Sequence, residues 1–139
     1  MKPTAIIALS LTSLLLTTAL FAADVSICNP GSAITTFPDG RLQSCNLRDI
    51  YTLQGVVCNA YSTISFHPNG LLRSCTSRDF YTYAGIPCDE YGEISFYPSG
   101  TLDTCRLSAQ TQIQGKVCDE LQPVTLFEDG RLKSCATPK

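Results

Sequence analysis

The sequence predicts an all-β protein of tandem antiparallel β-hairpin repeats, which form an elongated meander stapled by disulfides. Three observations support this prediction. The 139-residue chain repeats with a period of 30, a turn motif recurs once in each unit, and eight cysteines keep the same period. Outside the first 22 residues no segment has the sustained helical spacing of apolar residues that predicts an α-helix.

Residues 1–22 are predicted to be a secretory signal peptide. Lys2 precedes an uncharged run rich in Leu, Ala and Thr, and small residues follow that run. The run is shorter than the roughly 20 residues that a spanning helix needs. We therefore expect cleavage after Ala22 or a neighbouring alanine, and a retained membrane anchor is the alternative. The expected product is an exported protein, periplasmic or secreted, with a single domain over residues 23–139.

The charge of this domain argues against nucleic acid as a partner. Residues 23–139 carry 9 Lys and Arg against 12 Asp and Glu. Nucleic acids and anionic membrane surfaces both favour basic patches. We expect a protein or glycan partner, no cofactor and no membrane span after signal cleavage, and the sequence leaves the oligomeric state open.

The eight cysteines predict four disulfides. An even number of cysteines in an exported chain is typical of a disulfide framework, and the close C-x2–4-C pairs of a zinc site do not occur. One regular scheme pairs cysteines across unit junctions and leaves Cys28 and Cys135 unpaired. The other pairs them within units and leaves none unpaired, so we favour it. Its pairs are Cys28–Cys45, Cys58–Cys75, Cys88–Cys105 and Cys118–Cys135.

The repeat divides the domain into three full units and a truncated fourth. Conserved spacing between copies extends beyond the cysteines to apolar and glycine positions. Each unit is expected to bury its apolar face only against its neighbours, as in other repeat arrays. The units are 28–57, 58–87, 88–117 and 118–139.

A predicted β-hairpin opens each unit, with the turn sequences FPDG, HPNG, YPSG and FEDG. Proline presets the first corner of a type I turn and glycine takes the left-handed position that follows. This chemistry predicts a three-residue loop with a bulge at the glycine. In the second unit it places Phe66 opposite Leu72. It also places Ile64 opposite Ser74, with Ile64, Phe66 and Leu72 on the core face.

The second half of each unit is predicted to hold a third short strand. The segments LRDIYTLQGVV and SRDFYTYAGIP have β-branched and aromatic residues after an Arg-Asp corner, then a glycine. The matching segment of the third unit, LSAQTQIQGKV, keeps the glycine and lacks the Arg-Asp pair. The pairs Arg48–Asp49 and Arg78–Asp79 are therefore predicted to be local turn contacts rather than part of a functional site.

The hairpin core F-x-P-[DNS]-G-x-L-x-[ST] resembles the MORN-type repeat, and more closely its bacterial variant of the YwqK kind. The resemblance covers about nine residues in each copy, whereas the 30-residue period and the two cysteines per unit depart from that family. It implies stacked hairpins that act as a non-catalytic scaffold for proteins or lipids. It supplies no catalytic residue.

The sequence predicts no enzyme, no catalytic residue and no metal site. The single histidine, His67, occupies a slot that other units fill with phenylalanine or tyrosine, so a general base is not needed there. Carboxylates follow the first cysteine of the third unit, and we interpret them as a solvated acidic loop. The alternative is a weak calcium site formed by Asp89, Glu90 and Glu93.

The best candidate binding face is the aromatic slot immediately before each turn. It is expected to point away from the core face, so that one ring per unit forms a ladder suited to an extended glycan or a partner protein. The alternative is that these rings pack as a second small core. The slot holds Phe37, His67, Tyr97 and Phe127.

These observations predict a non-enzymatic, exported binding module or cell-envelope scaffold. The alternative is a small secreted effector or enzyme inhibitor that acts through one loop. The most divergent full unit is the third, between Asp103 and Lys116, and it would supply that loop.

Overall fold

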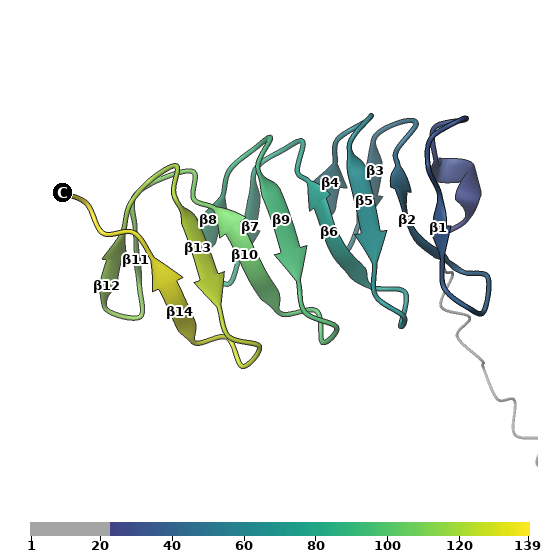
Figure 1. Ribbon diagram of the computed structural model, residues 1–139. Coiled ribbons are helices and arrows are strands. Elements are labelled where there is room, and N and C mark those ends of the chain that lie inside the picture. The colour runs from purple at the N-terminus through teal and green to yellow at the C-terminus, as the bar shows by residue number, and fades with distance from the viewer. Residues whose placement is uncertain (1–22) are drawn as a thin grey trace, which may run out of the picture.

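A computed structural model describes residues 23–139 as an elongated β array of two layers (Figure 1). The predicted signal segment, residues 1–22, lies outside the described residues. Between residues 23 and 139 no helix is long and apolar enough to cross a membrane.

The first layer is an eight-stranded antiparallel sheet whose strands follow one another in chain order (Figure 1). Each unit contributes one hairpin, which confirms the predicted meander of β-hairpins. The strands are β1 (Thr35–Thr36), β2 (Leu42–Asn46), β5 (Thr63–Phe66), β6 (Leu72–Thr76), β9 (Glu93–Phe96), β10 (Leu102–Arg106), β13 (Pro123–Leu126) and β14 (Leu132–Cys135).

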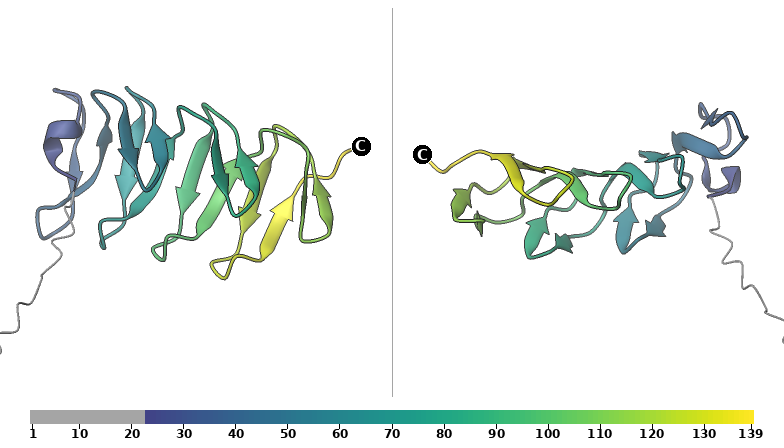
Figure 2. Two further views of the ribbon diagram at one scale, coloured as in Figure 1. Left: turned by 180° about the vertical axis from the view of Figure 1, so that it is seen from behind. Right: turned by 90° about the horizontal axis from the view of Figure 1, so that it is seen from below.

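The second layer consists of three two-stranded ribbons behind the sheet (Figure 2). A short 3-10 helix, η1 (Val25–Ile27), lies at the N-terminal end of the array. The ribbons are β3 (Tyr51–Leu53) with β4 (Val56–Cys58), β7 (Tyr81–Tyr83) with β8 (Ile86–Cys88), and β11 (Thr111–Ile113) with β12 (Lys116–Cys118).

The predicted third strand is present in each full unit as β3, β7 or β11, but the prediction missed a fourth strand, because the chain turns back on itself within that segment. In the first ribbon the turn residues Gln54 and Gly55 both have positive φ, at 54° and 78°. Two consecutive left-handed residues make the tight turn whose twist suits a hairpin. A glutamine at the first position is not the Asn or Asp that usually signals such a turn, so the sequence pattern did not reveal it.

The main hairpin turns have the predicted form. In the second unit the Gly70 N–H donates to the His67 carbonyl at 2.8 Å, and the His67 N–H donates to the Leu71 carbonyl at 2.8 Å. Gly70 has a φ of 85°, the left-handed conformation that glycine adopts without a steric penalty.

A second irregularity, between Leu72 and Ser74, changes the register beyond the turn. Phe66 lies opposite Leu72 as predicted, but Ser74 lies opposite Ser65, so the predicted Ile64–Ser74 pair was wrong. The extra residue reverses the in-and-out alternation of the strand. As a result Leu72 and Cys75 both point into the core, at 0% and 2% exposure.

The core lies between the two layers. Ile64, Phe66 and Leu72 are buried there as predicted, and the Tyr81 ring of the second layer packs edge-on against Phe96 with centroids 6.0 Å apart. On the outer face of the sheet one hydroxyl residue per strand lies in register, and cross-strand hydroxyl contacts such as Ser65–Ser74, at 2.8 Å, stabilise it.

All four disulfides are formed within units, as the favoured scheme predicted. They are Cys28–Cys45, Cys58–Cys75, Cys88–Cys105 and Cys118–Cys135. Three of them join a ribbon strand of the second layer to a strand of the sheet. Such a framework is typical of an oxidising, extracytoplasmic environment.

The array has two long edges with different chemistry. The turn edge, the lower edge in Figure 1, holds the sheet hairpin turns and the ribbon turns. The corner edge, the upper edge in Figure 1, holds the connections that pass between the two layers. Those connections are residues 47–50, 59–62, 77–80, 89–92, 107–110 and 119–122.

Candidate functional site

The aromatic slot predicted as a binding face lies on the turn edge, and two of its members bond to the next unit. The His67 side chain is half-buried, and its Nε2 lies 2.7 Å from the Phe96 carbonyl oxygen. The Tyr97 hydroxyl donates to the Leu126 carbonyl at 2.8 Å. Because both contacts span 29 residues, this slot joins neighbouring units in the middle of the array.

The two phenylalanines of the slot have cationic neighbours instead. The Arg41 guanidinium lies 6.0 Å from the centre of the half-buried Phe37 ring, and that of Arg131 lies 5.4 Å from the centre of the Phe127 ring. Phe127 is 42% exposed. The four slot residues therefore differ in surroundings and do not form one uniform exposed ladder.

Partial desolvation raises the pKa of the Tyr97 hydroxyl above its ordinary value, and the nearby Asp103 carboxylate raises it further. A tyrosine hydroxyl is protonated at neutral pH even without this shift, and the raised pKa extends to higher pH the range over which Tyr97 can donate to the Leu126 carbonyl.

Glutamines in the ribbon turns form a second set of contacts between units. The Leu72 N–H donates to Gln54 Oε1 at 2.7 Å, and the Leu132 N–H donates to Gln114 Oε1 at 2.9 Å. The equivalent position in the second ribbon is Ala84, which has no side-chain oxygen to accept such a bond. The turn edge is thus held together mainly by polar groups.

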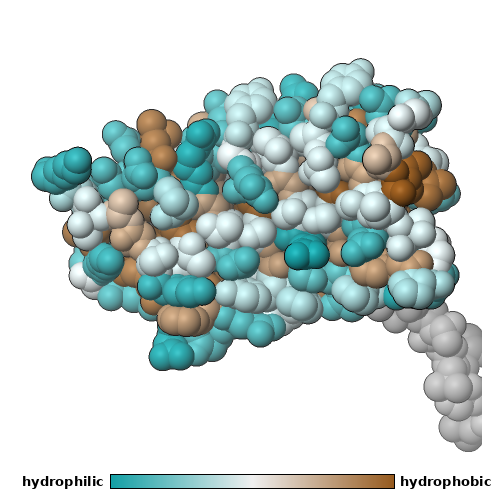
Figure 3. Space-filling model, in the orientation of Figure 1, coloured by the Kyte–Doolittle hydropathy of each residue, from teal (hydrophilic) through white to brown (hydrophobic). Residues whose placement is uncertain are grey.

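The corner edge presents large apolar side chains to solvent. Of the nine large apolar side chains that are exposed among residues 23–139, five lie in these connections. We call them the corner row: Ile50 (45% exposed), Tyr61 (74%), Phe80 (64%), Tyr91 (58%) and Leu121 (58%). The space-filling view shows a hydrophobic side chain protruding from this edge near the C-terminal end, above a mainly hydrophilic sheet face (Figure 3).

The backbone of three corner-row residues is strained. Tyr61, Tyr91 and Leu121 have φ values of 59°, 55° and 57°, and this left-handed conformation costs a residue with a Cβ roughly 1–2 kcal/mol. The first unit has Gly31 at the equivalent position, with a φ of 82°. Glycine therefore fits the turn, and the bulky residues are not required by the fold.

From the sequence, Tyr61 and Tyr91 were noted only as loop aromatics that add to the binding signal, and Ile50, Phe80 and Leu121 were assigned no role. The available signal was the shared slot of Gly31, Tyr61, Tyr91 and Leu121 in the 30-residue repeat. Glycine at this slot in the first unit indicates a left-handed backbone, and the large residues at the same slot in the other units are uncommon in such a turn. Their exposure, however, depends on how the units stack.

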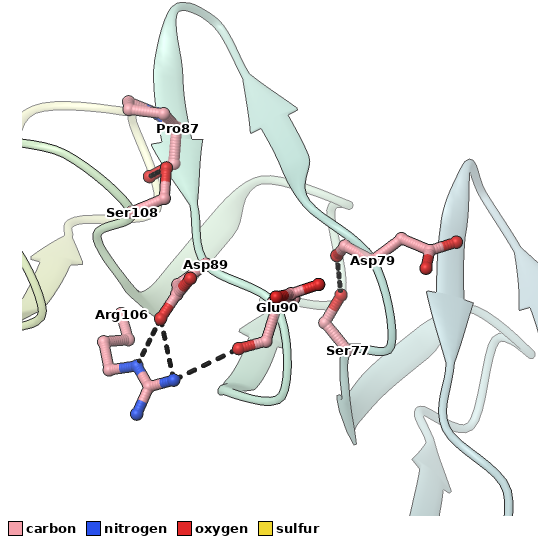
Figure 4. Close-up of polar contacts among 7 residues, drawn as sticks. All are labelled: Ser77, Asp79, Pro87, Asp89, Glu90, Arg106 and Ser108. Atoms are coloured by element: carbon pink, nitrogen blue, oxygen red, sulfur yellow. Dashed lines mark hydrogen bonds and ion pairs between the residues drawn. The ribbon is translucent and has the colours of Figure 1, made fainter.

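Each arginine of the corner edge is paired with an aspartate. Arg48 and Asp49 lie 2.8 Å apart, and Arg78 and Asp79 lie 3.9 Å apart, which agrees with the predicted local contacts. Arg106 forms the most extensive pairing (Figure 4). Its Nη2 lies 2.7 Å from Asp89 Oδ2, and its guanidinium also donates to the carbonyl of Glu90. No concentrated positive charge results from these arginines.

Of the carboxylates considered as a calcium site, Asp89 pairs with an arginine. Asp89 accepts hydrogen bonds from Arg106, so its oxygens already have a cationic partner (Figure 4). Nowhere in the part of the chain that the structure describes do three His, Cys, Asp or Glu side chains gather in a geometry that could hold a metal ion.

A groove of about 270 Å³ lies between the second and third ribbons, and the residues that line it include Tyr83, Ile86, Ile113 and Leu126. Its cause is a difference in side-chain size. Between the first two ribbons the Tyr81 ring covers Gly55, so that a Cβ there would lie 3.7 Å from Tyr81 Cε2. The third ribbon has Thr111 in the position of Tyr81, and nothing lies within 4 Å of a Cβ built on Gly85.

Comparison with known proteins found no family model that matches this chain, and no similar curated protein or solved structure. The resemblance to MORN-type repeats stays a prediction. The function has to be argued from the molecule itself.

Proposed function

We propose that this protein is an exported, non-enzymatic binding module or scaffold of the cell envelope, periplasmic or secreted. The corner row carries the proposal. It places five large apolar side chains along one edge, and exposed apolar rows of this kind mark interaction sites in soluble proteins. Tyrosine suits such a surface because its ring is apolar and its hydroxyl can still bond to a partner.

The strain at Tyr61, Tyr91 and Leu121 supports a role beyond folding. Large side chains in left-handed turns lower stability where glycine would not. A sequence that keeps them in three successive units gains nothing for the core, since all three side chains point into solvent. Binding is the use that an exposed apolar side chain can serve.

The proposal is tested by following the exported protein in the cells that produce it. The fraction that sediments with the envelope should fall when Tyr61, Phe80 and Tyr91 are replaced by serine, while export and disulfide formation stay normal on a non-reducing gel. Equal sedimentation of the variant and the wild type would contradict the proposal.

The proposed lack of enzymatic activity is tested separately. Purified protein should not hydrolyse generic ester, peptide or glycoside substrates. Turnover that disappears in His67→Phe, a change to the residue type found at the same slot in two other units, would show instead that His67 is catalytic.

A second candidate function is an effector or inhibitor that acts through the third unit. The groove beside β11 favours it, because one wall of this groove, Gln112, Ile113 and Gln114, belongs to the segment Asp103 to Lys116 that diverges most from the repeat. The substitution Thr111→Tyr would restore the ring that closes the equivalent space in the second unit. If the wild-type protein inhibits an enzyme and the Thr111→Tyr variant, with its corner row intact, does not, this candidate would be favoured over the first.

A further inference from the structure

We infer that the corner row binds a neutral, extended β-1,4-linked polysaccharide that lies along the axis of the array. This inference rests on the proposed binding function and names the class of ligand.

The spacing of the row suits a polymer with a disaccharide repeat. Tyr61, Tyr91 and Leu121 occupy one slot in successive units, and each unit adds two strands to the sheet. Neighbouring strands lie about 4.8 Å apart, so equivalent side chains recur about every 10 Å. An extended β-1,4-linked chain has a disaccharide repeat of similar length. Successive disaccharides would therefore meet the same contact in successive units.

The side chains have the chemistry that sugar rings require. The axial C–H groups of a pyranose ring form an apolar face that packs on an aromatic ring, and the equatorial hydroxyls remain free to form hydrogen bonds. Tyr61 and Tyr91 provide exposed rings with hydroxyl tips. Ile50 and Phe80 come from the connections that alternate with those of the tyrosines, which adds apolar contacts to the same edge.

The corner connections are hydrogen-bonded to one another across units, which holds the row in a fixed geometry. The Tyr61 N–H donates to the Leu47 carbonyl at 3.0 Å, and the Tyr91 N–H donates to the Ser77 carbonyl at 2.7 Å. The residues that carry these rings are therefore anchored to the preceding unit by main-chain bonds. A fixed row loses little conformational freedom when a ligand binds, which favours affinity.

The charge of the corner edge favours a neutral ligand. Arg48, Arg78 and Arg106 are each paired with an aspartate, so they do not form a site for sulfate, phosphate or carboxylate groups. Glu90 and Glu120 lie next to Tyr91 and Leu121 in the sequence and would repel an anionic chain. An uncharged glucan or chitin-type chain needs no unpaired arginine and is not repelled by the glutamates.

The test uses retention of the purified domain on microcrystalline cellulose and on chitin. We expect the double substitution Tyr61→Gly with Tyr91→Gly to lower the association constant by about tenfold or more, since two aromatic contacts are lost. Glycine is chosen because Gly31 occupies the same slot with a left-handed backbone. The melting temperature of the variant should therefore be unchanged or higher, which separates lost binding from lost folding.

Two further variants complete the design. Tyr61→Phe with Tyr91→Phe keeps the rings and should keep most of the retention. Phe127→Ala removes an exposed ring from the turn edge and should leave retention unchanged. This pattern on either matrix supports the inference.

Absence of retention on both matrices, or equal retention of the glycine variant, would overturn the inference. The glycine variant could fail to sediment with the envelope while the wild type is retained on neither polysaccharide. In that case the ligand would be of another class, and the proposed binding function would stand. If neither property changed, both proposals would be wrong.

Discussion

The turn edge and the corner edge of the array are built from the same repeat, yet their large side chains have opposite surroundings. On the turn edge His67, Tyr97 and Gln54 reach the next unit and bond to its backbone. On the corner edge Tyr61 and Tyr91 point into solvent even though their backbone is strained. One edge therefore holds the units together and the other presents a surface.

In this thin repeat array, the side chains that hold neighbouring units together lie on one edge, and the exposed apolar side chains lie on the other. Backbone bonds between units, the disulfides beneath them and the buried side chains of Leu47 and Leu107 hold the corner connections in place. The exposed side chains of the corner row are not part of that support and are thus free to vary. The turn edge lacks covalent links and depends on polar side chains instead.

The largest effect is expected from removing a disulfide beneath the corner edge. Replacing Cys58 and Cys75 by alanine should lower the free energy of unfolding by about 3 kcal/mol, because the bond closes a loop of this length in the unfolded chain. Denaturant titration measures the loss. The same change at Cys118 and Cys135 should cost less, since Cys135 is half-buried whereas Cys75 is 2% exposed. Equal losses would show that burial of the bond is unimportant.

A smaller loss is expected from the turn edge. Gln54→Ala removes the acceptor of the Leu72 N–H and should lower the free energy of unfolding by about 1 kcal/mol. The matched control is Gln110→Ala at an exposed position of the corner edge, which should change stability by less than about 0.5 kcal/mol. If both substitutions cost the same, the contrast between the two edges would not hold.

A gain is expected where the turn edge lacks its glutamine. Ala84→Gln would place a side-chain amide in the ribbon turn opposite the backbone of Leu102, as Gln54 and Gln114 are placed opposite Leu72 and Leu132. The free energy of unfolding should rise by about 0.5–1 kcal/mol, measured by denaturant titration. A destabilised variant would indicate that the second ribbon sits differently from the other two.

The smallest effect concerns acid. Backbone and side-chain hydrogen bonds from Arg41 hold the pKa of Asp39 below its ordinary value of 3.8, and Arg131 acts in the same way on Asp129. A carboxylate with a lowered pKa in the folded state stabilises the fold at pH values above 3.8. This contribution is lost as the pH falls through the lowered folded-state value.

The measurement is the melting temperature between pH 5 and pH 2, at low ionic strength because both ion pairs are exposed. The variant Asp39→Asn with Asp129→Asn should lose slightly less stability over this range than the wild type. A steeper acid loss in the variant would contradict the assignment.

Much of the fold could be predicted from the sequence because its signals are local. The HPNG turn, the burial of Ile64, Phe66 and Leu72, and the pairing of Cys58 with Cys75 follow from turn chemistry, strand alternation and an even cysteine count. The shift of register at Leu72–Ser74 could not be predicted in this way. It places Cys75 in the core, and no residue type marks it as a bulge.

The candidate site was harder to predict, because exposure depends on the neighbouring unit. The slot of His67 and Tyr97 was expected to carry a binding face, and the structure places these two side chains against the backbone of the next unit. Tyr61 and Tyr91 have no such neighbour and remain exposed. The repeat specifies which residues recur, but it does not specify which of them meet a partner in the adjacent unit.

The hairpin array, its period and the favoured disulfide scheme could thus be predicted from the sequence, because these depend on residues close together in the chain or repeated at a constant interval. Which rings join units, which face solvent, and where Thr111 leaves a groove beside Gly85 follow from the tertiary structure. These features depend on contacts between neighbouring units, such as that of His67 with a carbonyl 29 residues away, and their geometry is set by the twist and stacking of the layers.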